Sequence, residues 1–385
     1  MNTTVTQGVP LGPSLKAPLK VMIMAGGTGG HVFPALAVAD VLRARSVQVD
    51  WLGTPQGIEN TVVVAANIPL HHIHVKGVRG HGVLGLLKAS FLIVIAIVQA
   101  LVIFKKVKPD VVLGFGGFAS GPGGVAAKLL GKPLVIHEQN AIAGTTNRLL
   151  AKIANRVLVA FNGAFNDSAT PKKIQEKIVV VGNPVRTTIA HLSEPVVRYK
   201  ARAQLKEPVH LLVLGGSLGA QMINQTVPAA LEKLALDVRP SVWHQSGKSH
   251  LEVTIASYML HQVNAKVNAF IEDMAAAYAW ADIIVCRAGA LTVSELMVAG
   301  VAAILIPLPT AIDDHQTYNA AILTHASAGI ALPQLELSAE KLASVLLMVL
   351  PDRAHLQTLA TNARTLALPH AAETVADICM EFVSG

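Results

Sequence analysis

The sequence predicts an α/β protein with two doubly wound parallel sheets, one in each half of the chain. Apolar strand-like segments alternate with helical segments along its whole length, which is typical of parallel sheets with crossover helices. A glycine-rich turn directly follows an apolar strand at residues 26–30 and again at 215–219. A length of 385 residues is too great for one ordinary core, so two domains are expected.

The expected elements follow in order. In the first half we expect strands at residues 20–25, 48–52, 70–75, 110–113, 133–137 and 156–160, with the main helices at 33–44, 84–107, 122–130 and 145–153. A break rich in Gly, Asn and Pro follows at 162–185. In the second half we expect strands at 210–214, 240–245, 266–270, 282–285 and 302–306, with helices at 220–235 and 292–299. Residues 1–19 are then a flexible lead-in, 20–185 the N-terminal domain and 186–385 the C-terminal domain.

Composition limits the class of partner. Hydrophobic residues make up 52% of the chain and charged residues only 14%, with a formal net charge of +7. Aromatic residues make up 4%, which argues against a base-stacking surface for nucleic acid. The 2 cysteines provide no disulfide framework and no metal cluster, and they favour a reducing compartment.

The most apolar segment, residues 89–104, lies between Lys88 and Lys105 and is followed by further lysines. This pairing suits an anionic bilayer surface better than nucleic acid. As a helix the segment is about 24 Å long, short of a hydrocarbon core of about 30 Å. We therefore expect a half-buried helix with one apolar side available to lipid, and a true membrane span is the less favoured alternative.

The two glycine turns are candidate anion sites. A helix that begins after a turn without Cβ atoms presents unpaired N–H groups and about half a positive charge. Two such turns suggest two facing halves that grip a phosphorylated substrate, although tight packing alone also explains a single turn. The dinucleotide fingerprint fails because Val32 replaces its third glycine, and the Gly-Lys-Ser triplet at 247–249 fails as a phosphate loop because Val242 replaces its first glycine. A dehydrogenase and a nucleoside triphosphatase are therefore not expected.

A third glycine run, residues 114–124, also joins a strand to a helix. It is either a flexible loop or, together with the turn at 26–30, one diphosphate pocket. His31 lies in the first turn of the helix that follows the first glycine turn. The positive helix end favours a neutral imidazole, which is the state that a general base needs. A histidine that merely bonds to backbone groups at the helix start is the alternative.

Polar residues end several other strands, at the edge of the sheet where α/β proteins bind ligands. The run at 137–140 is His-Glu-Gln-Asn, but no partner pair at metal-ligand spacing accompanies it and the chain contains no Asp-x-Asp. We expect helix dipoles and backbone amides, and no metal, to neutralise a leaving group. Glu295 suits either the hydroxyls of a ribose or the dipole of its own helix. The run at 313–320 is either a reader of sugar hydroxyls or a solvated loop.

Seven of these segments, in this order, resemble the MurG family of peptidoglycan N-acetylglucosaminyltransferases, which have the GT-B fold. They are residues 26–31, 121–124, 137–140, 182–186, 215–217, 290–295 and 314–319, and the resemblance extends from about residue 20 to the end of the chain. It implies transfer of N-acetylglucosamine, with inversion, from UDP to the 4-hydroxyl of an undecaprenyl-diphosphate-linked muramyl-pentapeptide. It also implies that no cofactor is used, and that the enzyme is peripheral at the cytoplasmic face of the inner membrane.

The resemblance implies a role for individual residues as well. His31 is the expected general base, with Glu138 as a helper. The residues expected at the acceptor diphosphate are Gly26, Gly27, Gly116, Gly117, Ser120 and Gly121. The residues expected at the donor are Thr28, Gly29, Gly30, Asn140, Arg186, Ser217, Ile271, Ala290, Leu291, Thr292, Val293, Ser294, Glu295, Gln316 and Asn319. The expected membrane patch is Leu92, Ile95, Val102, Lys105 and Lys106.

Among the donor residues, Arg186 and Ser217 are expected at the diphosphate and Glu295 at the ribose. Ile271 is expected to meet uracil through its backbone, while Gln316 and Asn319 read the sugar hydroxyls. Three positions depart from the family pattern: Leu218 replaces a common glutamine, Phe118 replaces a frequent tyrosine, and His315 makes the sugar-contact assignment ambiguous by one residue.

Two other functions fit parts of the pattern. A UDP-N-acetylglucosamine 2-epimerase shares the two-domain architecture but needs no lipid, so the apolar segment and the third glycine run speak against it. A non-catalytic nucleotide-sugar-binding protein at a membrane surface needs no general base, so the role of His31 separates it from the transferase.

Overall fold

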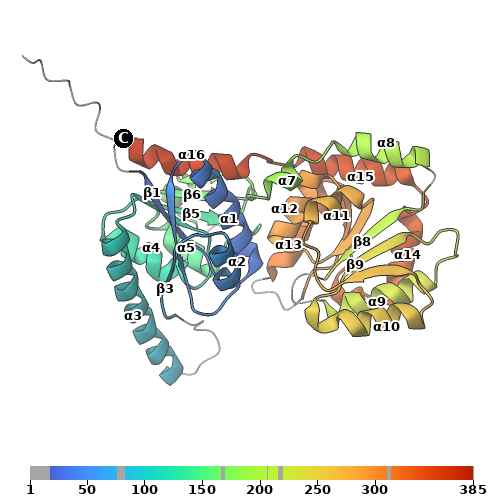
Figure 1. Cartoon of the computed structure of the whole chain (residues 1–385), viewed down its shortest axis with the longest axis horizontal. Helices are drawn as coiled ribbons and strands as arrows, with labels where there is room; N and C mark the ends of the chain where they lie inside the picture. The colour runs from blue at the N-terminus through green and yellow to red at the C-terminus, as the bar shows by residue number, and fades with distance from the viewer. Residues whose placement is uncertain are drawn as a thin grey trace, which may run out of the picture.

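The structure, a computed structural model, describes residues 18–75, 83–165, 170–205, 207–215, 220–309 and 314–384. Two α/β domains lie side by side, each with a central parallel sheet covered by helices (Figure 1). Of the expected lead-in, residues 1–17 lie outside the described part of the chain.

The first sheet has 7 parallel strands in the order β3-β2-β1-β4-β5-β6-β7. They are β1 (Lys20–Met24), β2 (Gln48–Gly53), β3 (Leu70–His72), β4 (Val111–Gly114), β5 (Leu134–Glu138), β6 (Arg156–Val159) and β7 (Ile178–Val180). Its helices are α1 (Gly29–Ala44), α2 (Glu59–Ala65), α3 (Val83–Val107), α4 (Ser120–Leu129), α5 (Thr145–Ala151) and α6 (Lys172–Gln175). The strand order reverses between β1 and β4, where doubly wound sheets bind their ligands.

The second sheet has 6 parallel strands in the order β10-β9-β8-β11-β12-β13. They are β8 (His210–Leu214), β9 (Ser241–Gln245), β10 (Ala265–Asn268), β11 (Ile283–Cys286), β12 (Ala302–Leu305) and β13 (Gly329–Ala331). The helices from here to the end are α7 (Thr187–Ala190), α8 (Pro195–Leu205), α9 (Gln221–Glu232), α10 (Leu251–Leu260), α11 (Met274–Trp280), α12 (Ala290–Ala299), α13 (His315–His325), α14 (Ala339–Val349), α15 (Arg353–Thr365) and α16 (Ala371–Ser384). This order also reverses, between β8 and β11.

Every strand expected from the sequence is present, with its ends shifted by a few residues at most. Two short edge strands were missed. Strand β7 lies inside the expected break at 162–185, and β13 follows α13. Each has only 3 residues, too few to show a period.

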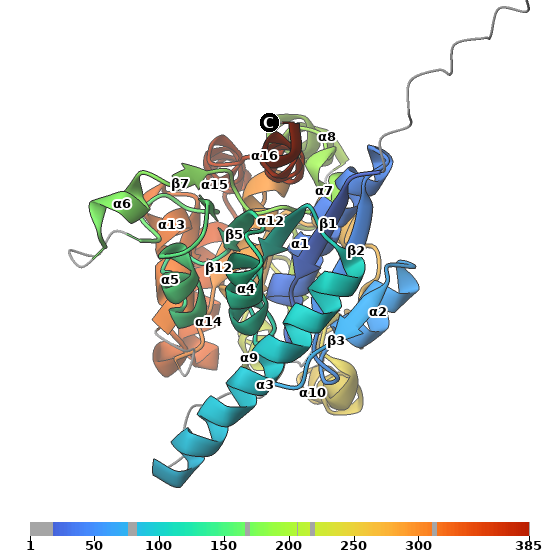
Figure 2. The ribbon, with the colours of Figure 1, turned by 90° about the vertical axis from the view of Figure 1, so that its left-hand side faces the viewer.

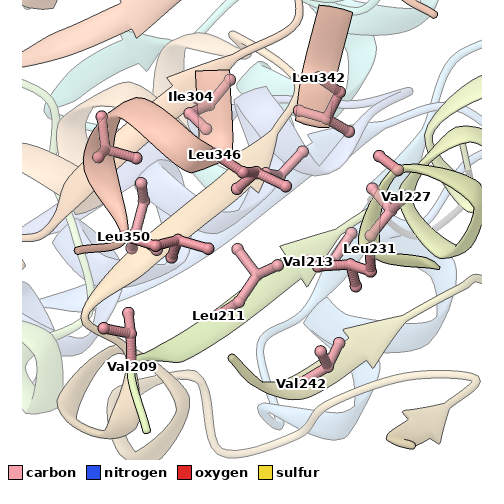
Figure 3. Close-up of a cluster of buried hydrophobic side chains, with 14 of the residues drawn as sticks. Val209, Leu211, Val213, Val227, Leu231, Val242, Ile304, Leu342, Leu346 and Leu350 are labelled. Carbon is pink, nitrogen blue, oxygen red and sulfur yellow. The ribbon is translucent and has the colours of Figure 1, made fainter. Parts of the chain in front are cut away.

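Helices cover both faces of each sheet, which explains why the strands are almost continuously apolar. In the second domain, Leu211 and Val213 of β8 point into a cluster with Val227 and Leu231 of α9 and with Leu346 of α14 (Figure 3). This core holds β8 in place, and the loops of the candidate site follow the carboxyl ends of β8 and its neighbouring strands.

Helix α16 returns to the first domain, although its residues lie in the segment 186–385 assigned to the second. It packs against α1 and β4, and Figure 1 shows it beside the first sheet. Val375, Ala376 and Cys379 are buried in the core of that sheet. A boundary at residue 186 therefore places α16 in the second domain by sequence, although the helix packs on the first. The sequence of an amphipathic helix does not indicate which of two sheets the helix covers.

Helix α3 lies along the outside of the first domain and packs against α4 (Figure 2). One side, with Ala96, Ala100 and Phe104, is buried. The polar Gln99 inside this apolar helix is explained by a hydrogen bond of 2.8 Å that its Oε1 accepts from the N–H of His74. Among the described residues, no helix is long and apolar enough to cross a membrane.

Candidate active site between the two domains

The loops at the carboxyl ends of the two sheets meet through Asn319 of α13. Its Oδ1 accepts a hydrogen bond of 2.9 Å from the N–H of Ala141, which follows β5 in the first domain. Its Nδ2 donates to the carbonyl of Ala288 after β11, at 3.1 Å, and to Oδ1 of Asn140, at 3.3 Å. The candidate site therefore lies where the two domains touch, and Asn319 is buried in that junction.

The first glycine turn places His31 on the first turn of α1. Gly27 has φ +90°, a conformation that side chains disfavour, and it precedes Thr28, the N-cap residue of α1. The carbonyl of Thr28 accepts hydrogen bonds of 3.2 Å from the N–H groups of His31 and Val32. The side chains of Thr28 and His31 also meet, with Oγ1 3.3 Å from Nδ1.

The imidazole of His31 lies against Gly116 in the third glycine run. A Cβ atom on Gly116 would lie 3.1 Å from Nε2 of His31, so glycine keeps this edge of the ring clear. Burial lowers the pKa of His31 below its usual 6.5, the charge of Glu138 opposes this shift, and His315 adds to it. The lowered pKa agrees with the neutral imidazole expected from the sequence, and burial is the largest cause of the shift.

Glu138 is buried at the end of β5, and donors surround its carboxylate. Its Oε1 accepts hydrogen bonds from the backbone N–H (2.9 Å) and Nδ2 (3.0 Å) of Asn140. Its Oε2 accepts from the N–H of Gly144 (3.0 Å) and from Nδ2 of Asn147 (2.8 Å). Because these four bonds use the capacity of the carboxylate, the geometry assigns Glu138 to shaping the loop of Asn140. The expected role of Glu138 as a helper to His31 stays a prediction, and its charge does act on the pKa of His31.

His137 is also a structural group. Its Nε2 lies 2.9 Å from the carbonyl of Gly182 and therefore donates to it, while Nδ1 accepts from Nε2 of Gln139 at 3.1 Å. Burial lowers the pKa of His137 to about 4, so the ring is neutral. With both nitrogens engaged it is not placed to bind a metal. Among the described residues, no group of three His, Cys, Asp or Glu side chains is arranged to hold one.

The first and third glycine turns stack backbone against backbone. A Cβ on Gly117, whose φ is +79°, would overlap the carbonyl oxygen of Gly26. The buried Oγ of Ser120 accepts from the N–H of Gly116 (3.1 Å) and lies 3.0 Å from the carbonyl of Met24. The same hydroxyl lies 2.6 Å from the carbonyl of Gly116, so Ser120 links the third glycine run to the end of β1. Its expected contact with the acceptor diphosphate stays a prediction.

Two of the backbone N–H groups expected at the acceptor diphosphate already have partners inside the protein. The N–H of Gly27 donates to the buried carboxylate of Glu59 at 3.0 Å, and that of Gly116 to Ser120. In the described structure these two N–H groups stabilise the turns, and the expected contact of Gly27 and Gly116 with the acceptor diphosphate stays a prediction. Gly117 and Gly121 remain partly accessible.

On the second domain, Glu295 of α12 faces Tyr278 of α11, whose hydroxyl donates to Oε2 at 2.8 Å. Burial raises the pKa of Glu295, whereas the charge of Arg186 and the bond from Tyr278 act in the opposite direction. The guanidinium of Arg186 lies 5.2 Å from the ring centre of Phe33 in α1. Arg186 thus touches the first domain while its charge acts on Glu295. The sequence did not predict a role for Tyr278, because a single tyrosine in an alanine-rich segment does not indicate that its hydroxyl bonds to Glu295.

Four other expected donor residues already use polar groups inside the protein. The hydroxyl of Ser294 donates to the carbonyl of Ala290 at 2.9 Å, within its own helix. The N–H of Ile271 donates to Oε1 of Gln245 at 2.8 Å, so this backbone donor is already engaged. Asn319 is committed to the domain junction, and Oε1 of Gln316 accepts from the N–H of Leu308 at 3.0 Å. In the described structure these contacts hold the side chains of Ser294 and Asn319, and their expected contacts with the donor stay predictions.

Other expected residues surround the same junction. Thr28, Gly29 and Gly30 open α1, Asn140 follows β5, and residues 290–295 open α12 after the N-cap residue Gly289. Ser217 lies outside the described residues.

Comparisons with known proteins decide the family. Residues 21–159 match the glycosyltransferase family 28 N-terminal domain, and residues 210–375 match the glycosyltransferase family 28 C-terminal domain. A curated relative from Cellvibrio japonicus is named UDP-N-acetylglucosamine--N-acetylmuramyl-(pentapeptide) pyrophosphoryl-undecaprenol N-acetylglucosamine transferase. It is 63% identical and the alignment covers 95% of this chain and 99% of the relative. The chain belongs to the MurG family of glycosyltransferases.

Solved structures agree with this family. The crystal structure of MurG from Acinetobacter baumannii is 44% identical, with a TM-score of 0.80 over 94% of this chain and all of that one (100%). A putative UDP-N-acetylglucosamine 2-epimerase from Listeria monocytogenes is 14% identical, with a TM-score of 0.64 over 96% of this chain and 98% of that one. The second likeness shows a shared fold alone. The two-domain GT-B architecture expected from the sequence is confirmed.

The neutral His31 leads to a prediction about pH. If His31 is the base, kcat/KM falls as the pH drops through its pKa, and burial places that pKa below 6.5. We expect the acidic limb of kcat/KM against pH to have its midpoint below 6.5. A midpoint at or above 6.5 would contradict the assignment. Replacement of the exposed His355 by alanine should leave the midpoint unchanged.

The junction at Asn319 leads to a second prediction. Asn319→Ala removes the acceptor of the Ala141 N–H, so exchange of that amide with deuterium should become faster. Mass spectrometry of peptides that contain residues 139–145 measures it. Tyr318→Phe, an exposed change on the same helix, is the control and should leave the exchange unaltered. Unchanged exchange in Asn319→Ala would show that this contact does not hold the domains.

Proposed function

We propose that this protein transfers N-acetylglucosamine from UDP-N-acetylglucosamine to the 4-hydroxyl of an undecaprenyl-diphosphate-linked muramyl-pentapeptide. The observation that carries the proposal is the 63% identity, over nearly the whole chain, to a relative named for this transfer. The neutral imidazole of His31, held where the two domains meet, supplies the chemistry that the reaction needs.

In the proposed reaction the acceptor oxygen attacks the anomeric carbon of the sugar in a single displacement. The bond from that carbon to the UDP oxygen breaks, UDP leaves with the electron pair, and the configuration inverts. The proton of the acceptor hydroxyl moves to Nε2 of His31. Nδ1 lies 3.3 Å from Oγ1 of Thr28. In the proposed reaction Nδ1 carries the ring proton and donates it to this hydroxyl, so that Nε2 is free to accept the proton of the acceptor.

The second domain holds the donor in this proposal. The N-terminus of α12, after Gly289, presents backbone N–H groups toward the diphosphate, and Arg186 adds a positive charge. Both stabilise the charge that develops on UDP as it leaves. Glu295 accepts hydrogen bonds from the ribose hydroxyls, and Tyr278 fixes its orientation through the bond to Oε2.

The acceptor is a lipid, and α3 supplies a surface for the membrane that contains it. Its exposed apolar side consists of Phe91, Val94, Val98 and Val102, which recur at helical spacing on one stripe. Exposed lysines follow at 105, 106 and 108. Apolar and cationic groups together favour an anionic bilayer, so we propose peripheral binding at the cytoplasmic face of the membrane. Of the expected patch, Leu92 and Ile95 are half-buried, whereas Val102 is exposed.

The first test of the function measures turnover. With UDP-N-acetylglucosamine and the lipid acceptor, we expect release of UDP, and His31→Ala should lower kcat by about 10²-fold or more while donor binding persists. Donor incubated alone and followed by NMR should keep its configuration. Epimerised sugar without acceptor would support the epimerase instead, and full activity of His31→Ala would remove the base from the mechanism.

The second test concerns the membrane. Val98→Asp together with Val102→Asp places two charges on the exposed stripe of α3 and should release the protein from vesicles that contain phosphatidylglycerol, measured by sedimentation. Met259→Asp with Leu260→Asp, on the exposed side of α10, is the matched control and should still bind. Circular dichroism establishes that both variants are folded. Binding of the folded α3 variant at the level of the original protein would refute this surface.

A further inference from the structure

A buried carboxylate lies directly behind the first glycine turn. Glu59, the first residue of α2, has no exposed surface. Its Oε2 accepts a hydrogen bond of 3.0 Å from the N–H of Gly27. Its Oε1 accepts from the N–H of Thr54 at 3.1 Å and lies 3.0 Å from the hydroxyl of the same residue. Among the described residues no Lys, Arg or His forms an ion pair with Glu59, so hydrogen bonds alone compensate its burial.

Three glycines make the space that this carboxylate fills. A Cβ on Gly26 would lie 2.6 Å from Oε1, and one on Gly57 would overlap Oε2. A Cβ on Gly53 would lie 3.0 Å from Cγ of Glu59. The backbone therefore surrounds the carboxyl group too closely for side chains at these positions, and the fit indicates a built contact between α2 and the turn.

The contact fixes the start of α1. Gly27 immediately precedes Thr28, the N-cap residue, and three residues separate it from His31. On the other side of the turn, the carbonyl of Gly26 meets Gly117 of the third glycine run. Glu59 on one side and Gly117 on the other thus hold the turn, and with it the direction in which Thr28 and His31 point.

We propose that Glu59 is a positioning residue for the transfer reaction, because its carboxylate holds the turn at 26–30 in the geometry that places His31 against the acceptor hydroxyl. The inference rests on the proposed function. Glu59 has no exposed surface and therefore acts through the turn and not on the substrate. Loss of the contact should reduce turnover more than donor affinity, since the second domain provides most of the donor contacts in the proposed complex.

The test replaces Glu59 with glutamine, which has nearly the same volume. An amide has only one acceptor oxygen, so it cannot serve the N–H of Gly27 and that of Thr54 at the same time. We expect kcat of Glu59→Gln to fall at least about tenfold with a change in KM for UDP-N-acetylglucosamine of less than about threefold. The acidic midpoint of kcat/KM against pH should also move, because the surroundings of His31 change.

The matched control is Thr54→Val, which removes a hydroxyl beside Oε1 but leaves the contact from Oε2 to Gly27. It should keep kcat within about twofold. Glu59→Gln with the original kcat and pH midpoint would overturn the proposal, as would a loss of stability without a loss of kcat per folded molecule. An original protein that transfers no sugar would instead overturn the proposed function itself.

A measurement on the original protein covers the case in which Glu59→Gln does not fold. The N–H of Gly27 donates to a fully buried acceptor, so its exchange with deuterium should be slow compared with that of an exposed loop amide. Mass spectrometry with fragmentation to single residues resolves it. Fast exchange at Gly27 would show that the carboxylate does not hold the turn and would refute the inference.

Discussion

Close approach of two backbone turns is the constraint on which the candidate site depends. The turn after β1 and the turn after β4 touch where a Cβ on Gly117 would overlap the carbonyl of Gly26. Gly116 likewise leaves room for the ring of His31. The parallel pairing of β1 with β4 brings the two turns to the same edge of the sheet, and Ser120 then joins them through hydrogen bonds. The position of His31 thus follows from the sheet topology and from the glycines that let the two turns approach each other.

The same edge is completed by the second domain. Asn319 bonds to both domains, and Arg186 lies against Phe33 of α1. Burial raises the pKa of Glu295, and the charge of Arg186 opposes that rise. Helix α16 returns from the second domain to cover the first sheet, so the chain crosses the junction twice. The proposed base lies in the first domain, and the residues proposed to hold the donor and its leaving group lie mainly in the second. The geometry of the reaction therefore depends on how the two domains meet.

Local sequence patterns were sufficient to predict the fold and the loops that form the candidate site. Continuous apolar strands, glycine turns and helix starts are local signals, and they predicted both sheets and the loops that carry His31, Glu138 and Glu295. What they could not indicate is which polar groups already have partners. Ser120 and Asn319 were expected to face ligands, yet contacts with residues far away in the sequence occupy them. Glu59 and Tyr278 were missed for the same reason, because their partners lie 32 and 17 residues away.

In the proposed reaction, UDP bound at the N-terminus of α12 releases the sugar, and the acceptor hydroxyl that receives the sugar gives its proton to His31 of α1. A crystal structure of the protein with UDP-N-acetylglucosamine bound tests it most directly. We expect the diphosphate at the N-terminus of α12, the ribose at Glu295, and the anomeric carbon facing Nε2 of His31 with space for one acceptor oxygen between them. A donor whose diphosphate lies in the turn at 26–30, or whose anomeric carbon faces away from His31, would contradict the account.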